Sequence, residues 1–518
     1  MPRALILGLG QSGLAMARWL ARGSWDLVVA DTRERPPMLE ALRERLPRAA
    51  FLSGPFGTDL LDGVSLLALS PGLSPRQPGV REMVAEAARR GIDRAGEIEL
   101  FARALDGLRQ ERAYAPVLVG VTGTNGKTTT TRMVARMFER AGRSVSVAGN
   151  ISPSALDALA GALDAGRLPQ AWVLELSSFQ LAGASSLRCT AAAVLNLSED
   201  HLDWHEGMDD YAASKARVFA PGTVRVLNRD DARVRAMLPP AGDAARVLTF
   251  GSGAPDRPGQ YGLVREGGLA WLACTDEDDA PRRRRRAPRA GAEAGVSAPE
   301  SEAPMVHRLM PVDALPVRGT HNALNALAAL ALACAAGLAL APALRALEEF
   351  RPEPHRTQTV ASIDGVEYID DSKGTNVGAT QAALNGLAAA PGAPGRIVAI
   401  LGGDGKGQSF EPLAEPLRQH ARAVVLIGRD APRIEQALQG LDLPLVHCAD
   451  LESAVRAASQ LARPGDTVLL SPACASLDMF RDYAHRAQVF VEAVARLAAE
   501  RGAQGPAVLA QAAPQEAS

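Results

Sequence analysis

The chain has 518 residues, of which 47% are hydrophobic, 22% charged and 4% aromatic, and its formal net charge is -2. This length allows about two to four domains with sizeable cores. The near-neutral charge and low aromatic content exclude a general attraction to nucleic acid or anionic lipid. Five scattered cysteines without a CxxC pair favour a reducing, cytoplasmic setting. No signal peptide is predicted, because the first residues run straight into a strand.

Three α/β blocks follow one another along the chain. The first opens with an apolar run at Ala4–Gly10 and a helix from Ser12, followed by strands at 26–30 and 65–69. The turn Gly8-Leu-Gly-Gln-Ser-Gly13 matches G-x-G-x-x-G, and Asp31 follows the next strand. The pattern is typical of a dinucleotide site, although any tight strand–helix turn can use such glycines. We predict a Rossmann-like domain over residues 1–95.

The second block begins near Gly96 and is predicted to span residues 96–352. Its short apolar, β-branched runs alternate with helical stretches, which predicts a parallel sheet covered on both faces. The expected strands are 117–121, 144–148, 171–176, 191–197 and 224–227. An Ala-rich apolar helix at 323–340 is expected to be a packed core helix rather than a membrane span.

A glycine-rich turn in this block is the strongest local signal. Gly123-Thr-Asn-Gly-Lys-Thr128 connects the strand at 117–121 to a helix expected at 129–140. Backbone N–H groups converge at such a turn, and the helix dipole favours an anion there. Lys127 can reach the outer phosphates of a nucleotide and Thr128 can bind Mg²⁺. The strict P-loop pattern requires glycine where this chain has Val121, so the match is a variant; the alternative is a Gly/Thr-rich turn with a surface lysine.

Other polar side chains lie where predicted strands of this block end. Asn150 follows one strand, and Glu175 lies inside an apolar one. Glu175 could be a satisfied structural carboxylate, but the phosphate loop two strands away favours a Mg²⁺ ligand. The segment 196–205, NLSEDHLDWH, is dense in ionisable groups, and Lys215 follows on a helix at 211–219.

The third block is expected at 353–498, after the proline-marked junction 350–354. It starts with a hairpin at 359–369 that turns at Asp364-Gly365, and strands follow at 396–401, 423–427 and 467–470. Residues 276–304 read as a solvated insertion, although the run of five arginines at 282–286 could also be a nucleic-acid arm. Residues 499–518 are predicted to be a disordered tail.

Nine motifs, taken together and in order, resemble the Mur ligase family from Ala4 to Leu497. They are GTNGKTTT, LELSSFQL, NLSEDHLDWH, YAASKARVF, GTHNALNALAA, PHR, DDSKGTN, LGGDGKG and LLSPACASLDMF. The insertion and the tail depart from the family pattern without touching a motif, and the sequence around His205 varies within the family. Within the family, the chain resembles the members that add D-glutamate to UDP-N-acetylmuramoyl-L-alanine in peptidoglycan precursor synthesis, a step linked to cell shape and division.

The resemblance implies an ATP-dependent ligase that forms an acyl phosphate and then an amide. Lys127, His201 and Lys215 are the implied catalytic residues, with Lys215 acting as a carbamate. Two Mg²⁺ ions are implied, held by Thr128, Glu175, His201 and Lys215. The implied ATP-binding residues are Gly123, Thr124, Asn125, Gly126, Lys127, Thr128, Thr129, Asn150, Asn322, Asn325, Arg356 and Asp371. The implied residues for the uridine diphosphate part of the substrate are Gly10, Gln11, Ser12, Asp31, Thr32, Arg33, Ser70, Pro71 and Gly72. Those for D-glutamate are Lys373, Thr375, Lys406, Ser476 and Tyr483.

The expected fold is α/β with three domains: a Rossmann-like N-terminal domain, a central P-loop-type mononucleotide-binding domain with a parallel sheet, and a Rossmann-like C-terminal domain. They are expected to bind the UDP-sugar, ATP and the amino acid, respectively. The expected partners are these small molecules, with no nucleic acid and no membrane, and the chain is expected to be a cytoplasmic monomer.

Other functions are compatible with single motifs. An NAD-dependent oxidoreductase would use the first block but leave the phosphate loop, Glu175 and Lys215 idle. A nucleic-acid ATPase would rest on the arginine run. The diaminopimelate- and lysine-adding ligases typically carry a DNPR-type motif, which this chain lacks. Folylpolyglutamate synthetase shares the phosphate loop but not the first block. The turn at Ser471–Ser476 could also be an ordinary strand–helix connection.

Overall fold

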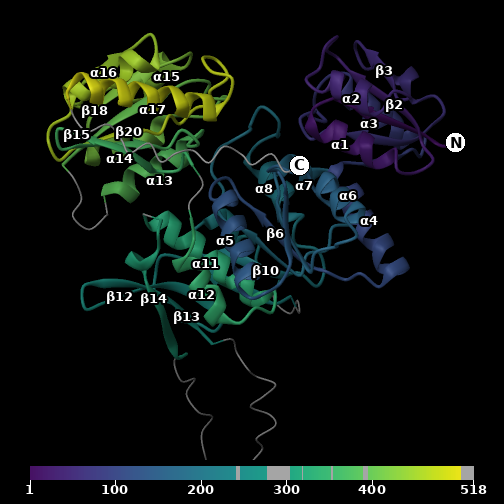
Figure 1. The fold of residues 1–518 in the computed structure, drawn as a ribbon, viewed down its shortest axis with the longest axis horizontal. Helices are drawn as coiled ribbons and strands as arrows, with labels where there is room; N and C mark the ends of the chain where they lie inside the picture. Colours follow the sequence, from purple (N-terminus) through teal and green to yellow (C-terminus); the bar gives the residue numbers. More distant parts are fainter. Residues whose placement is uncertain (241–244, 277–303, 318, 352–353, 389–394, 503–518) are drawn as a thin grey trace, which may run out of the picture. The chain divides into compact units, whose positions relative to one another are not determined.

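A computed structural model describes residues 1–240, 245–276, 304–317, 319–351, 354–388 and 395–502 (Figure 1). The chain divides into two compact units. The first comprises Met1–Leu197, Trp204–Leu315 and Leu324–Phe350, and the second comprises Ser198–Asp203, Pro316–Ala323 and the chain from Arg351 onward. Three sheets form the framework, two in the first unit and one in the second.

The first sheet has five parallel strands in the order β3-β2-β1-β4-β5. This is the doubly wound Rossmann order 3-2-1-4-5-6 without its sixth strand, and in such sheets ligands lie beyond the carboxyl ends of the strands. Helices α1 and α2 share the larger hydrophobic core, whereas α3 packs with a smaller cluster around Leu5, Leu7 and Leu67. The elements are β1 (Arg3–Leu7), α1 (Gln11–Leu20), β2 (Asp26–Asp31), α2 (Leu39–Arg45), β3 (Ala50–Ser53), β4 (Val64–Leu69), α3 (Val80–Arg89) and β5 (Asp93–Ala95).

The second sheet has nine strands in the order β14-β13-β12-β11-β10-β9-β6-β8-β7. From β7 to β12 the pairs are parallel, and β12, β13 and β14 add an antiparallel extension. Its strands are β6 (Val117–Thr122), β7 (Val145–Gly149), β8 (Ala171–Glu175), β9 (Ala191–Val194), β10 (Val224–Asn228), β11 (Val247–Phe250), β12 (Gln260–Glu266), β13 (Leu269–Thr275) and β14 (Val306–Pro311). Its helices are α4 (Glu97–Arg112), α5 (Lys127–Arg140), α6 (Ala155–Asp164), α7 (Ser178–Ala182), α8 (Met208–Ala216), α9 (Ala232–Arg235), α11 (Thr320–Ala335) and α12 (Leu340–Glu348).

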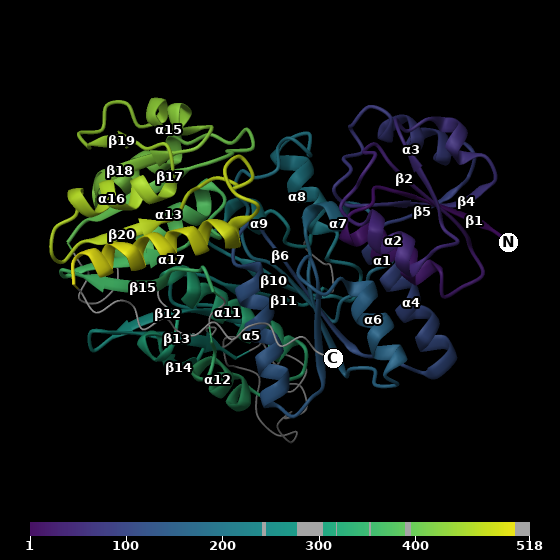
Figure 2. The ribbon, with the colours of Figure 1, turned by 45° about the horizontal axis from the view of Figure 1, so that its top comes forward.

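The third sheet has six strands in the order β15-β16-β20-β17-β18-β19, all parallel except β15. Helices α16 and α17 pack together on one core, and α13, α14 and α15 belong to the other (Figure 2). The elements are β15 (Gln358–Ile363), β16 (Val366–Asp370), α13 (Val377–Ala388), β17 (Ile397–Gly402), α14 (Ala414–His420), β18 (Ala421–Ile427), α15 (Ala431–Ala437), β19 (Leu445–His447), α16 (Leu451–Leu461), β20 (Thr467–Leu470) and α17 (Tyr483–Glu500).

The predicted fold class is confirmed, and the bounds of several elements differ from the predicted ones. The hairpin does turn at Asp364-Gly365, where both residues have positive φ. Helix α5 begins at Lys127, two residues before the predicted start. The second sheet is not wholly parallel, because residues 260–275 and 306–311 form the antiparallel strands β12–β14. Helix α17 extends to Glu500, whereas 503–518 and most of the predicted insertion, 277–303, lie outside the described residues. Within the described ranges, no helix is long and apolar enough to cross a membrane.

Candidate active site

The predicted phosphate loop connects β6 to α5 at the carboxyl edge of the second sheet. Gly123 and Gly126 have φ values of 146° and 82°, which lie in the range that glycine adopts without a steric penalty. Lys127 folds back over the loop, and its Nζ donates to the carbonyls of Gly123 at 2.9 Å and Thr124 at 2.7 Å. Thr128 and Thr129 are buried in the first turn of α5. The loop therefore has the conformation of an anion-binding turn at a helix N-terminus.

Two asparagines from neighbouring elements hold this loop. Asn196, after β9, accepts from the N–H of Asn125 at 2.8 Å and donates to its carbonyl at 3.1 Å. Asn325, on α11, lies so close to Gly126 that a Cβ added to this glycine would be 2.3 Å from its Oδ1. Asn325 was predicted, but Asn196 was assigned no role from the sequence. Its position at the end of the strand beside β6 is the signal that could have identified it.

Lys215 lies beneath the phosphate loop. Its side chain is buried, and Nζ donates to the carbonyl of Gly123 at 2.9 Å and to the Thr122 hydroxyl at 3.4 Å. The ammonium also lies 4.5 Å from the ring centre of Tyr211, whose hydroxyl is 3.1 Å from that of Thr124. The structure therefore brings Lys215 and Lys127 to the same loop.

Glu175 ends β8, the strand next to β6, and is buried. Its Oε1 accepts from Asn150 Nδ2 at 3.2 Å, and the Asn150 N–H donates to the Glu175 carbonyl at 2.7 Å. Its Oε2 is buried without a hydrogen-bond partner among the described residues. An orphaned carboxylate oxygen at a phosphate loop fits a hard cation such as Mg²⁺. His201 belongs to the second unit, where its Nε2 lies 3.6 Å from Asp200.

His205, whose role the sequence left open, is fully buried. Its Nδ1 lies 2.8 Å from Asp210 and its Nε2 lies 2.9 Å from the Ser178 hydroxyl. This Ser-His-Asp chain has the connectivity of a hydrolytic triad. However, Ser178 is only 2% exposed and begins α7, so its hydroxyl does not face a substrate. The imidazole instead fixes the 204–210 segment against α7, packing on Trp204 and Tyr211.

The carboxyl edge of the first sheet collects the residues predicted for the uridine diphosphate part. The Ser70 hydroxyl donates to the Gly8 carbonyl at 2.7 Å. Asp31 accepts from the N–H of Leu9 at 2.7 Å and from the Arg33 side chain. Burial acts to raise the pKa of Asp31, but these hydrogen bonds prevail and hold it at about 2. Asp31 thus braces the glycine-rich turn while Gln11, Thr32 and Arg33 are exposed beside it.

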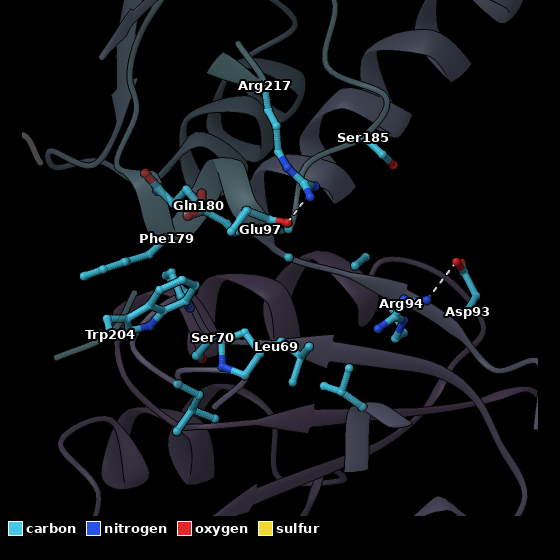
Figure 3. A pocket seen from close by; sticks show the side chains of 18 of the residues that line it. Leu69, Ser70, Asp93, Arg94, Glu97, Phe179, Gln180, Ser185, Trp204 and Arg217 are labelled. Atoms are coloured by element: carbon cyan, nitrogen blue, oxygen red, sulfur yellow. Dashed lines mark hydrogen bonds between the residues drawn. The ribbon is translucent and has the colours of Figure 1, made fainter. Parts of the chain in front are cut away.

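A cavity of about 570 Å³ lies between the ends of β4 and β5 and helix α7 (Figure 3). Ser70 and Pro71 line it, together with Phe179 and Trp204, whose rings stack 4.7 Å apart. Glu97 also lines it, and burial raises the pKa of its carboxyl. Glu97 accepts from the Ser12 hydroxyl and from Gln180, each at 3.4 Å, and so connects the glycine-rich turn with the SSFQ segment. The sequence assigned no role to these aromatic rings or to Glu97.

In the second unit, three loops meet where the adjacent strands β16, β20 and β17 end. They carry Lys373 and Thr375, Ser476, and Lys406, respectively. Lys373 Nζ is 3.2 Å from the Tyr483 hydroxyl, and Lys406 Nζ is 2.7 Å from Asp200. The loops after β17 and β20 also pair through their backbones, with two hydrogen bonds between Asp404 and Ala475. Four of the five residues predicted for the amino acid thus belong to one loop cluster, and the fifth, Tyr483, begins α17 and contacts Lys373.

Asp371 lies at the same edge and is buried. Burial raises its pKa to about 6, although the Ser471 hydroxyl, the charge of Arg356 and the Thr357 N–H oppose the shift. The Ser471 hydroxyl donates to Oδ2 at 2.6 Å and the Thr357 N–H donates to Oδ1 at 3.1 Å. Two residues predicted for ATP, Arg356 and Asp371, therefore interact electrostatically within the second unit.

Family models cover most of the chain. A MurD-like N-terminal domain of Mur ligases matches residues 2–93, the Mur ligase middle domain matches 121–266, and the Mur ligase glutamate ligase domain matches 355–474. The UDP-N-acetylmuramoylalanine–D-glutamate ligase of Ralstonia nicotianae is 55% identical over 97% of this chain and 98% of its own. The ligase of the same name from Burkholderia pseudomallei is 56% identical over the same shares. The chain belongs to the Mur ligase family.

A solved Mur ligase has the same fold. The MurF ligase from Thermotoga maritima in complex with ADP matches with a TM-score of 0.56 and 17% identity, covering 90% of this chain and 93% of its own. This likeness shows the fold. The roles of single residues are inferred from the geometry of this chain.

The distribution of lysines along the chain is a further signal for the site. Of the 56 basic residues Lys and Arg, only Lys127, Lys215, Lys373 and Lys406 are lysines. In this Mur ligase, arginine supplies every other cationic side chain, and all four lysines are predicted site residues. Lysine offers a compact ammonium that can lose its proton or react, which a guanidinium cannot do. Their positions are thus consistent with a chemical need for an amine.

Proposed function

We propose that this Mur ligase uses ATP to add D-glutamate to UDP-N-acetylmuramoyl-L-alanine in peptidoglycan precursor synthesis. Phosphoryl transfer from ATP to the substrate carboxylate gives an acyl phosphate, and the D-glutamate amine then displaces phosphate to form the amide. The observation that carries the proposal is that one chain contains both a phosphate loop, in the first unit, and a cationic, hydroxyl-rich loop cluster, in the second. The names of the two relatives support the choice of substrates.

ATP and Mg²⁺ are assigned to the phosphate loop and its surroundings. The loop amides and Lys127 would hold the phosphates, and the orphaned Glu175 oxygen and Thr128 would hold one Mg²⁺. His201 and Lys215, as a carbamate, are proposed for a second. When bound, the cations neutralise the negative charge of the phosphates during phosphoryl transfer. In the described part of the chain no cluster of three metal-binding side chains is preformed. This agrees with Mg²⁺, which takes one or two protein ligands together with phosphates and water.

The other two substrates are assigned to the remaining strand edges. The glycine-rich turn of the first sheet presents backbone N–H groups to a pyrophosphate, and Ser70–Gly72 lie beside it. The dicarboxylic amino acid is assigned to Lys373, Thr375, Lys406, Ser476 and Tyr483. Two ammonium groups and several hydroxyls match two carboxylates by charge-assisted hydrogen bonds. Asn150, Asn322, Asn325, Arg356 and Asp371 are proposed to surround the rest of ATP.

We further infer that the enzyme works as a cytoplasmic monomer on small molecules, without nucleic acid or membrane partners. The net charge of -2 gives no general attraction to nucleic acid or anionic lipid.

The decisive experiment measures phosphate release from ATP with each combination of acceptor and amino acid. We expect release only when UDP-N-acetylmuramoyl-L-alanine and D-glutamate are both present. L-glutamate, lysine and diaminopimelate should each support little turnover. Equal turnover with L-glutamate or lysine would overturn the amino-acid assignment. Stimulation by DNA, or binding of NAD seen by calorimetry, would point to the alternative functions.

A further inference from the structure

Arg486 lies beneath the loop cluster of the second unit and is fully buried. All three of its side-chain nitrogens donate hydrogen bonds. Nε donates to the Ser372 hydroxyl at 3.0 Å, Nη2 to the Ser372 carbonyl at 2.8 Å, and Nη1 to the Cys474 carbonyl at 3.1 Å. The Ser372 hydroxyl in turn donates to the Tyr483 carbonyl at 2.8 Å. One guanidinium therefore joins the loop that carries Lys373 to the loop that carries Ser476.

The surroundings of this guanidinium are unfavourable for a cation. Every atom that accepts from it is neutral, and among the described residues no carboxylate lies within ion-pair distance of it. Arg486 also lies in the first turn of α17, where the helix dipole is positive. Burial lowers its pKa to about 10. A buried charge without an ionic partner is costly unless its positive potential or its fixed geometry serves a purpose.

We propose that Arg486 is a positioning residue for the amino-acid substrate: it fixes two of the three pocket loops and supplies a permanent positive charge behind them. The inference rests on the proposed assignment of D-glutamate to this loop cluster. A neutral side chain could hold the loops by hydrogen bonds alone, but it would not add to the potential that attracts a dicarboxylate. Arginine supplies both functions because its planar group makes several directed bonds while remaining charged.

The ionisable groups near Arg486 do not pair with it directly, although their charges act on it. The groups whose charges act on Arg486 are Cys474, Asp478, Asp370 and Asp371. Burial raises the pKa of Cys474 to about 12, so this thiol is neutral. Asp370 pairs with His355 at 2.7 Å, and Asp371 is engaged by Ser471. Asp478 accepts from the Arg429 N–H at 2.9 Å. None of these carboxylates forms an ion pair with Arg486.

The test uses two substitutions in the full-length enzyme. Arg486→Met removes the charge and the hydrogen bonds, and we expect the KM for D-glutamate to rise about tenfold or more. The KM values for ATP and the UDP-sugar should change less than about twofold.

Arg486→Lys keeps a cation that burial will make easier to deprotonate. The ratio of its KM for D-glutamate to that of the wild type should therefore rise between pH 7 and pH 9. Taking the ratio cancels the titration of D-glutamate itself.

Arg496→Lys is the matched control, because Arg496 lies on the same helix with its side chain 49% exposed and pairs with Glu452. It should behave like the wild type at every pH. A flat KM ratio for Arg486→Lys, or equal effects of Arg486→Met on all three substrates, would overturn the proposal. Lys373→Ala and Ser476→Ala are measured in parallel. If they leave the KM for D-glutamate unchanged, the pocket assignment itself is wrong; if they raise it while the Arg486 variants do not, only the present inference fails.

Discussion

The phosphate loop and the amino-acid loop cluster are built differently for similar ligands. Both lie at the carboxyl ends of parallel strands, and both are assigned to anions. The phosphate loop is one continuous turn, shaped by Gly123 and Gly126 and fixed from outside by Asn196 and Asn325. The amino-acid cluster is assembled from three loops that span more than a hundred residues. Two buried side chains join these loops: Arg486, and Gln408 of the loop after β17, whose Nε2 donates to the Ala473 carbonyl at 2.7 Å.

This difference explains what each region demands of its sequence. A backbone cradle requires glycines at fixed spacing, so it leaves a continuous motif. A side-chain pocket requires a buried polar scaffold whose members lie far apart in the chain. Substitutions in the first region should therefore act through backbone geometry, whereas those in the second should act through charge and loop register.

The largest effect is expected from Lys215→Arg in the first region. Arginine keeps the positive charge but cannot form the carbamate that we propose as an oxygen ligand for Mg²⁺. Ligation should fall about 10²- to 10³-fold, the loss typical of removing one group that stabilises transition-state charge. ATP binding, followed by calorimetry, should persist. A fully active variant would refute the carbamate.

The small number of lysines makes a direct measurement possible. Labelled bicarbonate should give one carbamate carbon signal in the wild type, and this signal should be absent from Lys215→Arg. Arg233→Lys adds a fifth lysine at an exposed site that pairs with Asp209. It should give no new carbamate signal, because an exposed ammonium stays protonated at neutral pH.

Gly126→Ala tests whether the phosphate loop depends on backbone geometry. The new Cβ would be 2.3 Å from Asn325 Oδ1 at a residue with φ of 82°. The phosphate loop and Asn325 must therefore move apart. A displacement of about 1 Å can lower the rate about 100-fold. Gly142→Ala is the control, since Gly142 also has positive φ, at 72°, but has open space around it. Phosphate release should fall sharply only in the first variant. Equal losses in both would indicate that backbone strain alone is responsible.

The same contrast limits what the sequence could predict. The strand–glycine–helix pattern around Lys127 indicated the phosphate loop directly, and β-branched runs indicated most parallel strands. The residues that hold the loops were less visible. Asn196, Glu97, Gln408 and Arg486 act across elements, so their partners depend on which strands become neighbours in the sheet. The antiparallel strands β12–β14 were given no bounds from the sequence, because their residues alternate only weakly between buried and exposed.

Asp371 should make the stability of the second region depend on pH. Its folded pKa of about 6 lies above the unfolded value of about 3.9, so the folded state binds the proton more tightly. Stability should therefore decrease as the pH rises from about 4 to 6 and should then level off. Two pKa units correspond to about 3 kcal/mol.

Asp371→Asn should remove this component. Its melting temperature relative to the wild type should rise between pH 4.5 and pH 7, whatever the constant cost of the lost hydrogen bonds. A difference independent of pH would show that Asp371 titrates normally. The experiment compares the stability of the variant with that of the wild type at each pH. Activity is not a suitable measure, since the variant is expected to bind ATP poorly at every pH.

The smallest effect is expected from shortening the insertion in the first unit. Thr275 ends β13 and pairs directly with Val306 at the start of β14, so a short turn can connect the two strands. We replace 277–303 with Asn-Gly, which favours the tight turns of antiparallel hairpins. Asp276 is kept because it lies 3.1 Å from His307.

Loop closure depends weakly on length, at about 0.6 kcal/mol per doubling, so folding should be preserved. Turnover should stay within about twofold of the wild type, because neither anion-binding region includes these strands. A folded deletion protein with a more than tenfold loss would assign the insertion a function and would mean that the two regions do not account for activity by themselves.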